Sequence, residues 1–202
     1  MTLSERESKG YLSKSIRIVD MKPATEFSII LCVDETTAEI VVDFRELLPK
    51  TPFRDDPPHV TLIRVVSIPE SMSDDELLSF MRPKLNFQIP LKISFKKVAD
   101  HPSEKYGTTT VLEYKVAPEL IEFRKSLIKT LRSEFCIIPK EVADDYSPHM
   151  TLILGKTLDS NSKKEAAEIF SKTSGVYFTQ WKLLRYEEND KTKVKVVEGD
   201  RL

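Results

Sequence analysis

The spacing of apolar residues changes along the chain between the pattern of a strand and the pattern of a helix. A continuous apolar run at 27–35, rich in β-branched residues, is typical of a buried strand. The next run repeats apolar residues every three or four positions up to Pro49, as a helix does. Residues 59–66 and 71–85 then have strand and helix character in turn. Two alternating runs before position 118, joined by a polar segment, predict an antiparallel pair of strands.

The same order of elements returns in the second half of the chain. Residues 118–135 have an apolar helical face, and a strand, a helix and a closing strand pair follow. Two related halves predict a duplicated α+β fold. We expect two antiparallel sheets facing a central cleft, helices on the outside, and one domain at 25–202 made of two pseudo-symmetric lobes. Residues 1–24 are polar and are expected to be an N-terminal extension, with room for a short strand at 15–19.

Composition narrows the classes of function. The formal net charge of -1 does not supply the basic field that long nucleic acids attract, so a substrate with few phosphates fits better than long double-stranded nucleic acid. No apolar run resembles a secretory signal or reaches the roughly 20 residues of a membrane span. Both cysteines lie in apolar runs, which indicates buried thiols and a reducing compartment. We therefore expect a cytoplasmic monomer without membrane contact.

The phrase Pro-His-x-Thr-Leu-Ile occurs twice, 90 residues apart. The chain has three histidines, and two of them, His59 and His149, occupy the same position of this phrase. Because successive side chains of a strand point to opposite faces, His59 shares a face with Thr61, and His149 with Thr151. If the two motif strands are neighbours, two imidazoles and two hydroxyls surround one small space.

This set of side chains suits displacement at a phosphorus centre. Two imidazoles on opposite sides of a phosphorus atom suit an in-line displacement, because one accepts the proton of the attacking water and the other protonates the leaving oxygen. Threonine hydroxyls can donate to the non-bridging oxygens, and the set needs no metal, cofactor or nucleophilic side chain. One copy alone is more often a packed histidine beside a strand-favouring threonine, and it is the second copy that favours a site.

Other polar residues near the motifs have plainer interpretations. The acidic pairs at 55–56 and 144–145 offer carboxylates to a metal, but Asp-Asp near a proline is a common turn composition, so we expect no metal site. His101 lies in a polar turn without a partner phrase and is expected to be a solvated loop residue. Alternation points Arg64 away from the histidine face, so we do not expect it to act in catalysis.

The two phrases, with the helix and aromatic-x-Pro segment before the second, resemble the 2H phosphoesterase superfamily, the LigT-like or 2′-5′ RNA ligase group. The resemblance covers about residues 25–202. It implies a bilobal α+β fold and metal-independent chemistry on 2′,3′-cyclic phosphates or 2′-5′ phosphodiester bonds of nucleotides or RNA ends. It also implies that His59 and His149 are the acid/base pair and that Thr61 and Thr151 bind the phosphate. In that group hydrolysis opens a cyclic phosphate to a 2′-phosphate, and ligation joins a cyclic end to a 5′-hydroxyl.

Two alternatives stay open at the level of sequence. A non-catalytic module that binds a nucleotide or an RNA end in the same cleft is the alternative function, although the intact histidine and threonine sets favour the enzyme. Tyr146, three residues before His149, is a candidate to stack on a base, with core packing as the alternative. Trp181, Arg185 and Tyr186 in the closing strands are weaker candidates for the cleft wall.

Overall fold

The order of strands and helices predicted from the sequence is confirmed, and the fold is α+β. The computed structural model describes residues 25–51, 56–86, 91–102, 107–134, 136–140, 146–173, 175–187 and 190–201, so the expected N-terminal extension at 1–24 lies outside the described residues. The elements are β1 (Thr25–Val33), α1 (Glu35–Glu46), β2 (His59–Ile68), α2 (Asp74–Met81), the 3-10 turn η2 (Arg82–Lys84), β3 (Lys92–His101), β4 (Thr109–Lys115), α3 (Pro118–Ser133), β5 (His149–Ile153), α5 (Ser160–Ser171), β6 (Val176–Glu187) and β7 (Asp190–Arg201).

Local sequence sets where the helices begin. Asp34 precedes α1 and accepts a hydrogen bond from the backbone N–H of Thr37 at 2.9 Å, as an N-cap does. Ser73 and Glu76 form a reciprocal capping box at the start of α2. Pro118 occupies the first turn of α3, where its missing N–H costs nothing. These starts fix which residues of each helix face the sheet.

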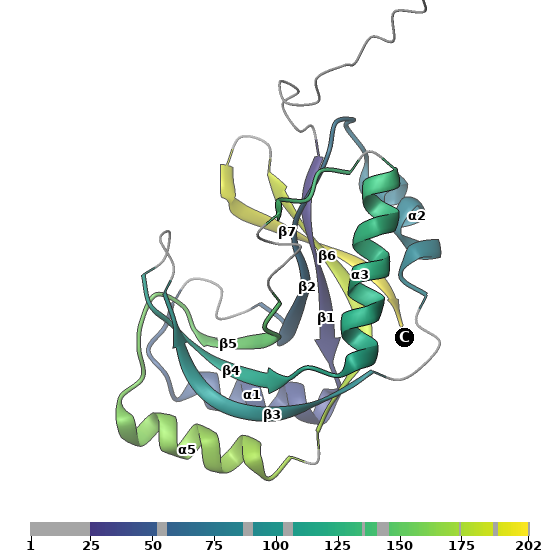
Figure 1. Cartoon of the computed structure of the whole chain (residues 1–202). Helices are drawn as coiled ribbons and strands as arrows, with labels where there is room; N and C mark the ends of the chain where they lie inside the picture. The colour runs from purple at the N-terminus through teal and green to yellow at the C-terminus, as the bar shows by residue number, and fades with distance from the viewer. Residues whose placement is uncertain are drawn as a thin grey trace, which may run out of the picture.

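The strands of the described residues form one antiparallel sheet in the order β2-β1-β6-β3-β4-β5, with β7 beside β6. One continuous sheet therefore replaces the two separate sheets that the sequence led us to expect. The reason is the length of β6, which has 12 residues. Its first two residues, Val176 and Tyr177, pair with β3, and the stretch from Phe178 to Arg185 pairs with β1. In Figure 1 the sheet bends at this join, so that β3, β4 and β5 lie across β1, β2 and β6.

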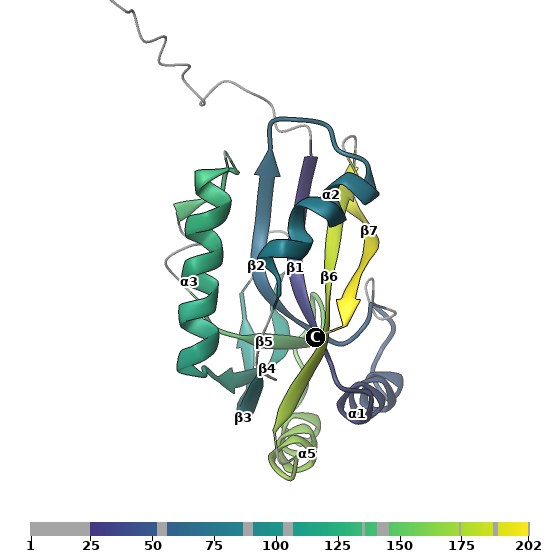
Figure 2. The same ribbon diagram turned by 90° about the vertical axis from the view of Figure 1, so that its right-hand side faces the viewer.

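The two halves of the chain exchange elements between the two arms of the bent sheet. The β3–β4 hairpin of the first half pairs with β5, whereas β6 of the second half pairs with β1, which in turn pairs with β2. The helices are exchanged between the arms as well. The first-half helix α1 contacts β5, and the second-half helix α3 lies along the β1–β2 arm (Figures 1 and 2). The two motif strands β2 and β5 are the ends of the strand order, and the bend brings them into contact.

The core is built from both halves. Phe44 of α1 packs edge-on against Phe170 of α5 with ring centroids 6.2 Å apart, and Phe95 of β3 lies 6.5 Å from the same ring. Cys32 and Cys136 are buried, as the sequence predicts, and burial raises the pKa of each thiol to about 11. Among the described helices, none has the length and apolar composition needed to cross a membrane.

Candidate active site

Each motif histidine opens its strand and is held by the same local hydrogen bond. Nδ1 of His59 lies 2.7 Å from the carbonyl oxygen of Pro57, and Nδ1 of His149 lies 2.8 Å from that of Ser147. Because a carbonyl oxygen can only accept, Nδ1 carries the hydrogen in both rings, and Nε2 of the neutral ring keeps its lone pair. Two imidazoles 90 residues apart therefore offer the same nitrogen for proton transfer.

The prolines of the two phrases explain this shared geometry. A proline holds the residue before it in an extended conformation, and the carbonyl of that preceding residue is the one that binds the imidazole. The carbonyl of the proline itself continues the sheet. The N–H of Val33 donates to Pro58 at 3.5 Å, and the N–H of Tyr114 donates to Pro148 at 3.0 Å. Each histidine is thus anchored between a rigid lead-in and a neighbouring strand.

A cavity of about 520 Å³ lies between the motif strands, and three of the four predicted residues line it: Thr61, His149 and Thr151. The fourth, His59, begins the same strand two residues before Thr61 and is half-buried. It is not among the lining residues, yet it lies close enough to His149 for the charge of one ring to lower the pKa of the other. The bend of the sheet thus brings Thr61 of the first phrase and His149 and Thr151 of the second to one cavity.

Burial controls the protonation of both motif histidines. It lowers the pKa of His59 to about 4, and the positive charges of Arg45 and His149 add to this effect. Burial also lowers the pKa of His149, where the neighbouring His101 acts in the same direction and the carboxylate of Glu113 opposes it. His59 is therefore neutral at pH 7. The two rings differ in one respect: a carboxylate, Glu113, acts on the pKa of His149, and no carboxylate is among the groups that shift the pKa of His59.

The lowered pKa of His59 predicts that the fold weakens in acid. The unfolded chain, with a histidine pKa near 6.5, binds more protons than the folded chain between pH 6.5 and 4. The free energy of unfolding should therefore fall as the pH drops through this window, by roughly 1–3 kcal/mol from this residue. Urea unfolding at pH 7 and pH 4.5 measures the effect, which should be smaller in His59→Gln. An equal pH dependence in wild type and variant contradicts the assignment.

His101 is not the solvated loop residue that the sequence led us to expect. It is the last residue of β3, it lines the cavity, and its ring centroid lies 4.9 Å from that of His149. Its Nε2 lies 2.9 Å from Oε1 of Glu113. The expectation failed because the polar residues at the end of β3, considered without their partner strand, have the composition of a turn. Continuing the β3–β4 pairing to its end, where His101 lies opposite Thr109, would have placed His101 in the strand.

Arg64 also lines the cavity, contrary to the expectation from strand alternation. The reason is a bulged segment of β2. Ile30, Ile29 and Phe27 of β1 pair with Thr61, Ile63 and Val66, so β2 has an extra residue between Thr61 and Ile63 and another between Ile63 and Val66. An extra residue breaks the period of two, and side chains on either side of it no longer alternate in the expected order.

The bulge leaves a strained residue in the cavity wall. Val65 has a φ of 57°, in the left-handed region that a β-branched residue adopts only at a cost of about 1–3 kcal/mol. Its N–H donates to Oγ of Ser28 at 3.1 Å, and this oxygen lies 2.8 Å from the hydroxyl of Tyr186. Val65, Ser28 and Tyr186 all line the cavity. Of the other candidates for its wall, Trp181 is buried in the core and Arg185 pairs with Asp74 of α2.

Tyr146 is placed by packing rather than by the cavity. Its ring lies under the guanidinium of Arg124, with 4.5 Å between Cζ and the ring centroid. The ring packs against the hydrophobic core, and burial raises the pKa of the hydroxyl above its ordinary value. Tyr146 is not among the residues that line the cavity. This placement favours core packing over the stacking of a base.

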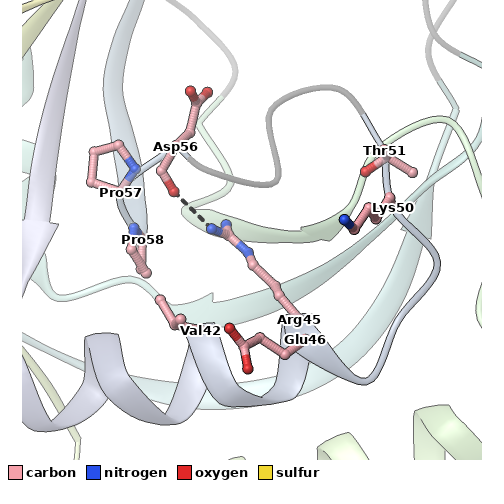
Figure 3. A pocket seen from close by; sticks show the side chains of 8 residues that line it. All are labelled: Val42, Arg45, Glu46, Lys50, Thr51, Asp56, Pro57 and Pro58. Atoms are coloured by element: carbon pink, nitrogen blue, oxygen red, sulfur yellow. Dashed lines mark hydrogen bonds between the residues drawn. The ribbon is translucent and has the colours of Figure 1, made fainter.

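Two buried arginines fasten the motif strands to helices. Arg124 of α3 donates from Nε to the carbonyl of Leu62 at 2.9 Å. Arg45 of α1 donates from Nη2 to the carbonyl of Thr151 at 2.6 Å and from Nη1 to that of Asp56 at 2.8 Å. Figure 3 shows the second bond, in the wall of another cavity of about 500 Å³. Arg45 therefore joins the lead-in of the first motif to the threonine of the second.

Removing Arg45 should cost stability. In Arg45→Met two part-buried carbonyls lose a charged donor, so the free energy of unfolding should fall by about 2–4 kcal/mol, measured by urea unfolding. Arg82→Met is the matched control, because Arg82 is half-exposed and its ion pair with Asp200 should contribute less than about 1 kcal/mol. Equal stability of the two variants contradicts a fastening role for Arg45.

The acidic pairs lie mostly outside the described residues. Asp55 and the pair at 144–145 are not described, and their interpretation as turns stays a prediction. Asp56 is described, and its carbonyl oxygen accepts from Arg45. Within the ranges that the structure describes, no three side chains of His, Cys, Asp or Glu gather in a way that could hold a metal ion.

An antiparallel sheet whose edge strands bring two His-x-Thr motifs to one cavity defines the class of the two-histidine phosphoesterases. The family model described as the 2′-5′ RNA ligase superfamily matches residues 33–190, and the chain belongs to this superfamily. Membership supports an enzyme of the phosphoesterase or RNA ligase type.

Solved structures show the same fold at low sequence identity. Escherichia coli LigT complexed with NADP+ aligns with a TM-score of 0.55 and 13% identity over 89% of this chain and 97% of that one. LigT complexed with 3′-AMP aligns with a TM-score of 0.53 and 14% identity over 90% and 98%. TT0787 of Thermus thermophilus aligns with a TM-score of 0.51 and 12% identity over 88% and 96%. No curated protein sequence matches the chain.

Proposed function

We propose that this protein is a metal-independent phosphoesterase acting on 2′,3′-cyclic phosphates or 2′-5′ phosphodiester bonds of nucleotides or RNA ends, with 2′-5′ ligation as the reverse reaction. One observation carries the proposal: two matching phrases, each with the same fixed imidazole tautomer, converge on one cavity. The cavity of about 520 Å³ has the size of a small-molecule site. The complex of LigT with 3′-AMP supports a nucleotide as the class of substrate.

The two histidines take different roles because their surroundings differ. His59, with its pKa near 4, is neutral at pH 7, and its Nε2 accepts a proton from the water that attacks phosphorus. Burial lowers the pKa of His149 as well, but this ring has the carboxylate of Glu113 to favour its charged form, so we assign to it the donation of the Nε2 proton to the leaving 3′-oxygen. The bond between phosphorus and the 3′-oxygen breaks, and the product is a 2′-phosphate. In the ligation of a cyclic end a 5′-hydroxyl takes the place of water and the two roles stay the same. They exchange when a 2′-5′ bond is cleaved back to a cyclic phosphate, because the 3′-hydroxyl then attacks and the 5′-oxygen leaves.

Three further groups stabilise the negative charge that builds up on phosphorus. The hydroxyls of Thr61 and Thr151 line the cavity from facing strands and donate to the two non-bridging oxygens. Arg64 adds a positive charge at the same wall, and its effect on the pKa of His149 supports a position of that charge near the reacting atoms. The bulge in β2 is what turns Arg64 to this side.

A panel of substrates tests the proposed function. The purified protein, in the presence of EDTA, is offered 2′,3′-cyclic nucleotides, ADP-ribose cyclic phosphate, RNA with a cyclic end and 2′-5′ oligoadenylate. We expect turnover of at least one of them, with a 2′-phosphate as the product isomer of the cyclic substrates, identified by phosphorus NMR. Binding of a nucleoside 2′-phosphate without turnover of any substrate would instead favour the non-catalytic module.

A further inference from the structure

The third histidine of the chain lies directly against the second motif histidine. The rings of His101 and His149 meet edge to face, with an angle of 70° between their planes, and both line the cavity. His149 is therefore restrained twice, by the carbonyl of Ser147 at Nδ1 and by the ring of His101. A ring held in two ways keeps Nε2 in one direction, which is the condition for efficient proton transfer.

Glu113 holds His101 in this position. Its side chain is largely buried, it lies opposite His149 in the β4–β5 pairing, and its Oε1 lies 2.9 Å from Nε2 of His101. The hydrogen bond from His101 is the largest cause of the lowered pKa of Glu113, so the carboxylate is ionised and accepts from Nε2. The ammonium groups of Lys96 and Lys97 lie 3.3 and 3.5 Å from Oε2 of Glu113. They balance the negative charge of this largely buried carboxylate.

The charges around His149 come from three strands. Glu113 of β4 favours the protonated ring, while His101 of β3 opposes it. Arg64 of β2 also opposes it, and His149 in turn lowers the pKa of His59 on the same strand. Glu113 and His101 therefore act in opposite directions and contact each other. Together with burial, the largest cause of the lowered pKa, they set how readily His149 gains and loses its proton.

We propose that His101 and Glu113 are a positioning pair that orients the His149 ring and sets its protonation for the role of proton donor. Only the donor role rests on the proposed function, since the contacts themselves do not depend on any substrate. The pair acts through His149, and neither residue belongs to the duplicated phrase. His59 has different neighbours, namely the carbonyl of Pro57 and the charge of Arg45.

Titration of the His149 ring by NMR tests the pair without any substrate. We expect the pKa of His149 to rise in His101→Gln, because the imidazole that opposes its charged form and covers one side of its ring is removed. We expect the same pKa to fall in Glu113→Gln, because the carboxylate that favours the charged form is removed. Glu198→Gln is the matched control. Glu198 of β7 pairs with Lys182, does not line the cavity and is not among the groups that shift the pKa of His149, so the titration of His149 should be that of wild type.

The outcomes separate this proposal from the proposed function. Shifts of opposite sign support the positioning pair even if no phosphoester is hydrolysed. Unchanged titration of His149 in His101→Gln overturns it, and this variant alone suffices if Glu113→Gln does not fold, because His101 is partly exposed. With an active enzyme, His101→Gln should lower kcat on the order of 10-fold with little change in KM, and it should move the alkaline limb of the pH profile. A stability loss with an unmoved limb contradicts the pair.

Discussion

Replacing either motif histidine with alanine is expected to lower kcat/KM by about 10²- to 10⁴-fold on the substrate that the panel identifies. The physical reason is that each ring presents Nε2 for one proton transfer, and its Nδ1 is already committed to a backbone carbonyl. Water can replace the lost group only poorly, because it is neither oriented nor matched in pKa. Steady-state kinetics of His59→Ala and His149→Ala at several pH values measure the effect.

The fold should survive these two replacements. His59 is half-buried and uncharged at neutral pH, so its removal creates no unpaired buried charge. Circular dichroism and a urea midpoint near that of wild type at pH 7 serve as the controls for His59→Ala and His149→Ala. Full activity in either variant, with the fold retained, would sink the acid/base assignment for that histidine.

The second large effect is expected at the motif threonines. Thr61→Val and Thr151→Val keep the shape and the strand preference of the residue but remove the hydroxyl from the cavity. Loss of one donor to a developing oxyanion typically costs about 10²- to 10³-fold in kcat. We expect about 10²-fold for each variant, with a smaller change in KM, because the donors act mainly when the charge on phosphorus increases.

A strand threonine outside the cavity provides the control for these variants. Thr179 of β6 donates its hydroxyl to the carbonyl of Val33 at 3.4 Å and does not line the cavity. Thr179→Val should therefore retain kcat within about twofold, since the variant loses a weak hydrogen bond outside the cavity. A loss of kcat in Thr179→Val equal to that in Thr61→Val would show that the valine acts on the strand and not on the substrate.

Periodicity predicted the order of the elements because each block has a single dominant period. The capping residues Asp34 and Ser73 and the first-turn Pro118 reinforce it locally. The exchange of hairpins between the halves was not predictable in this way. It depends on β6 being long enough to pair with β1 and β3 in succession, and strand length in a sequence does not say which partners a strand will have.

The predicted site rested on repetition, whereas the placement of Arg64 rested on strict alternation. Two copies of one phrase singled out His59 and His149 as candidates independently of register, and the structure brings Thr61, His149 and Thr151 of the two phrases to one cavity. Arg64 was assigned to the wrong face because alternation cannot foresee a bulge held by Val65 in a left-handed conformation. His101 was missed because its importance comes from a partner on the next strand.

The buried arginines were beyond the reach of hydrophobic periodicity for a related reason. A charged residue in a helical stripe is normally interpreted as solvent-facing, but a guanidinium can be buried when backbone carbonyls accept from its donors. Arg45 donates to a carbonyl of β5, far after it in the chain, and Arg124 donates to a carbonyl of β2, far before it. Such partners are visible only once the fold is known.

A double-mutant cycle at His59 and His149 tests most directly whether the two phrases form one active site. Both histidines are proposed to act on the same phosphorus in one step, so their contributions should not multiply. We predict that the double alanine variant loses about as much kcat/KM as the more damaged single variant. Losses that multiply across the cycle would show two independent contributions and contradict a single site shared by the two halves of the chain.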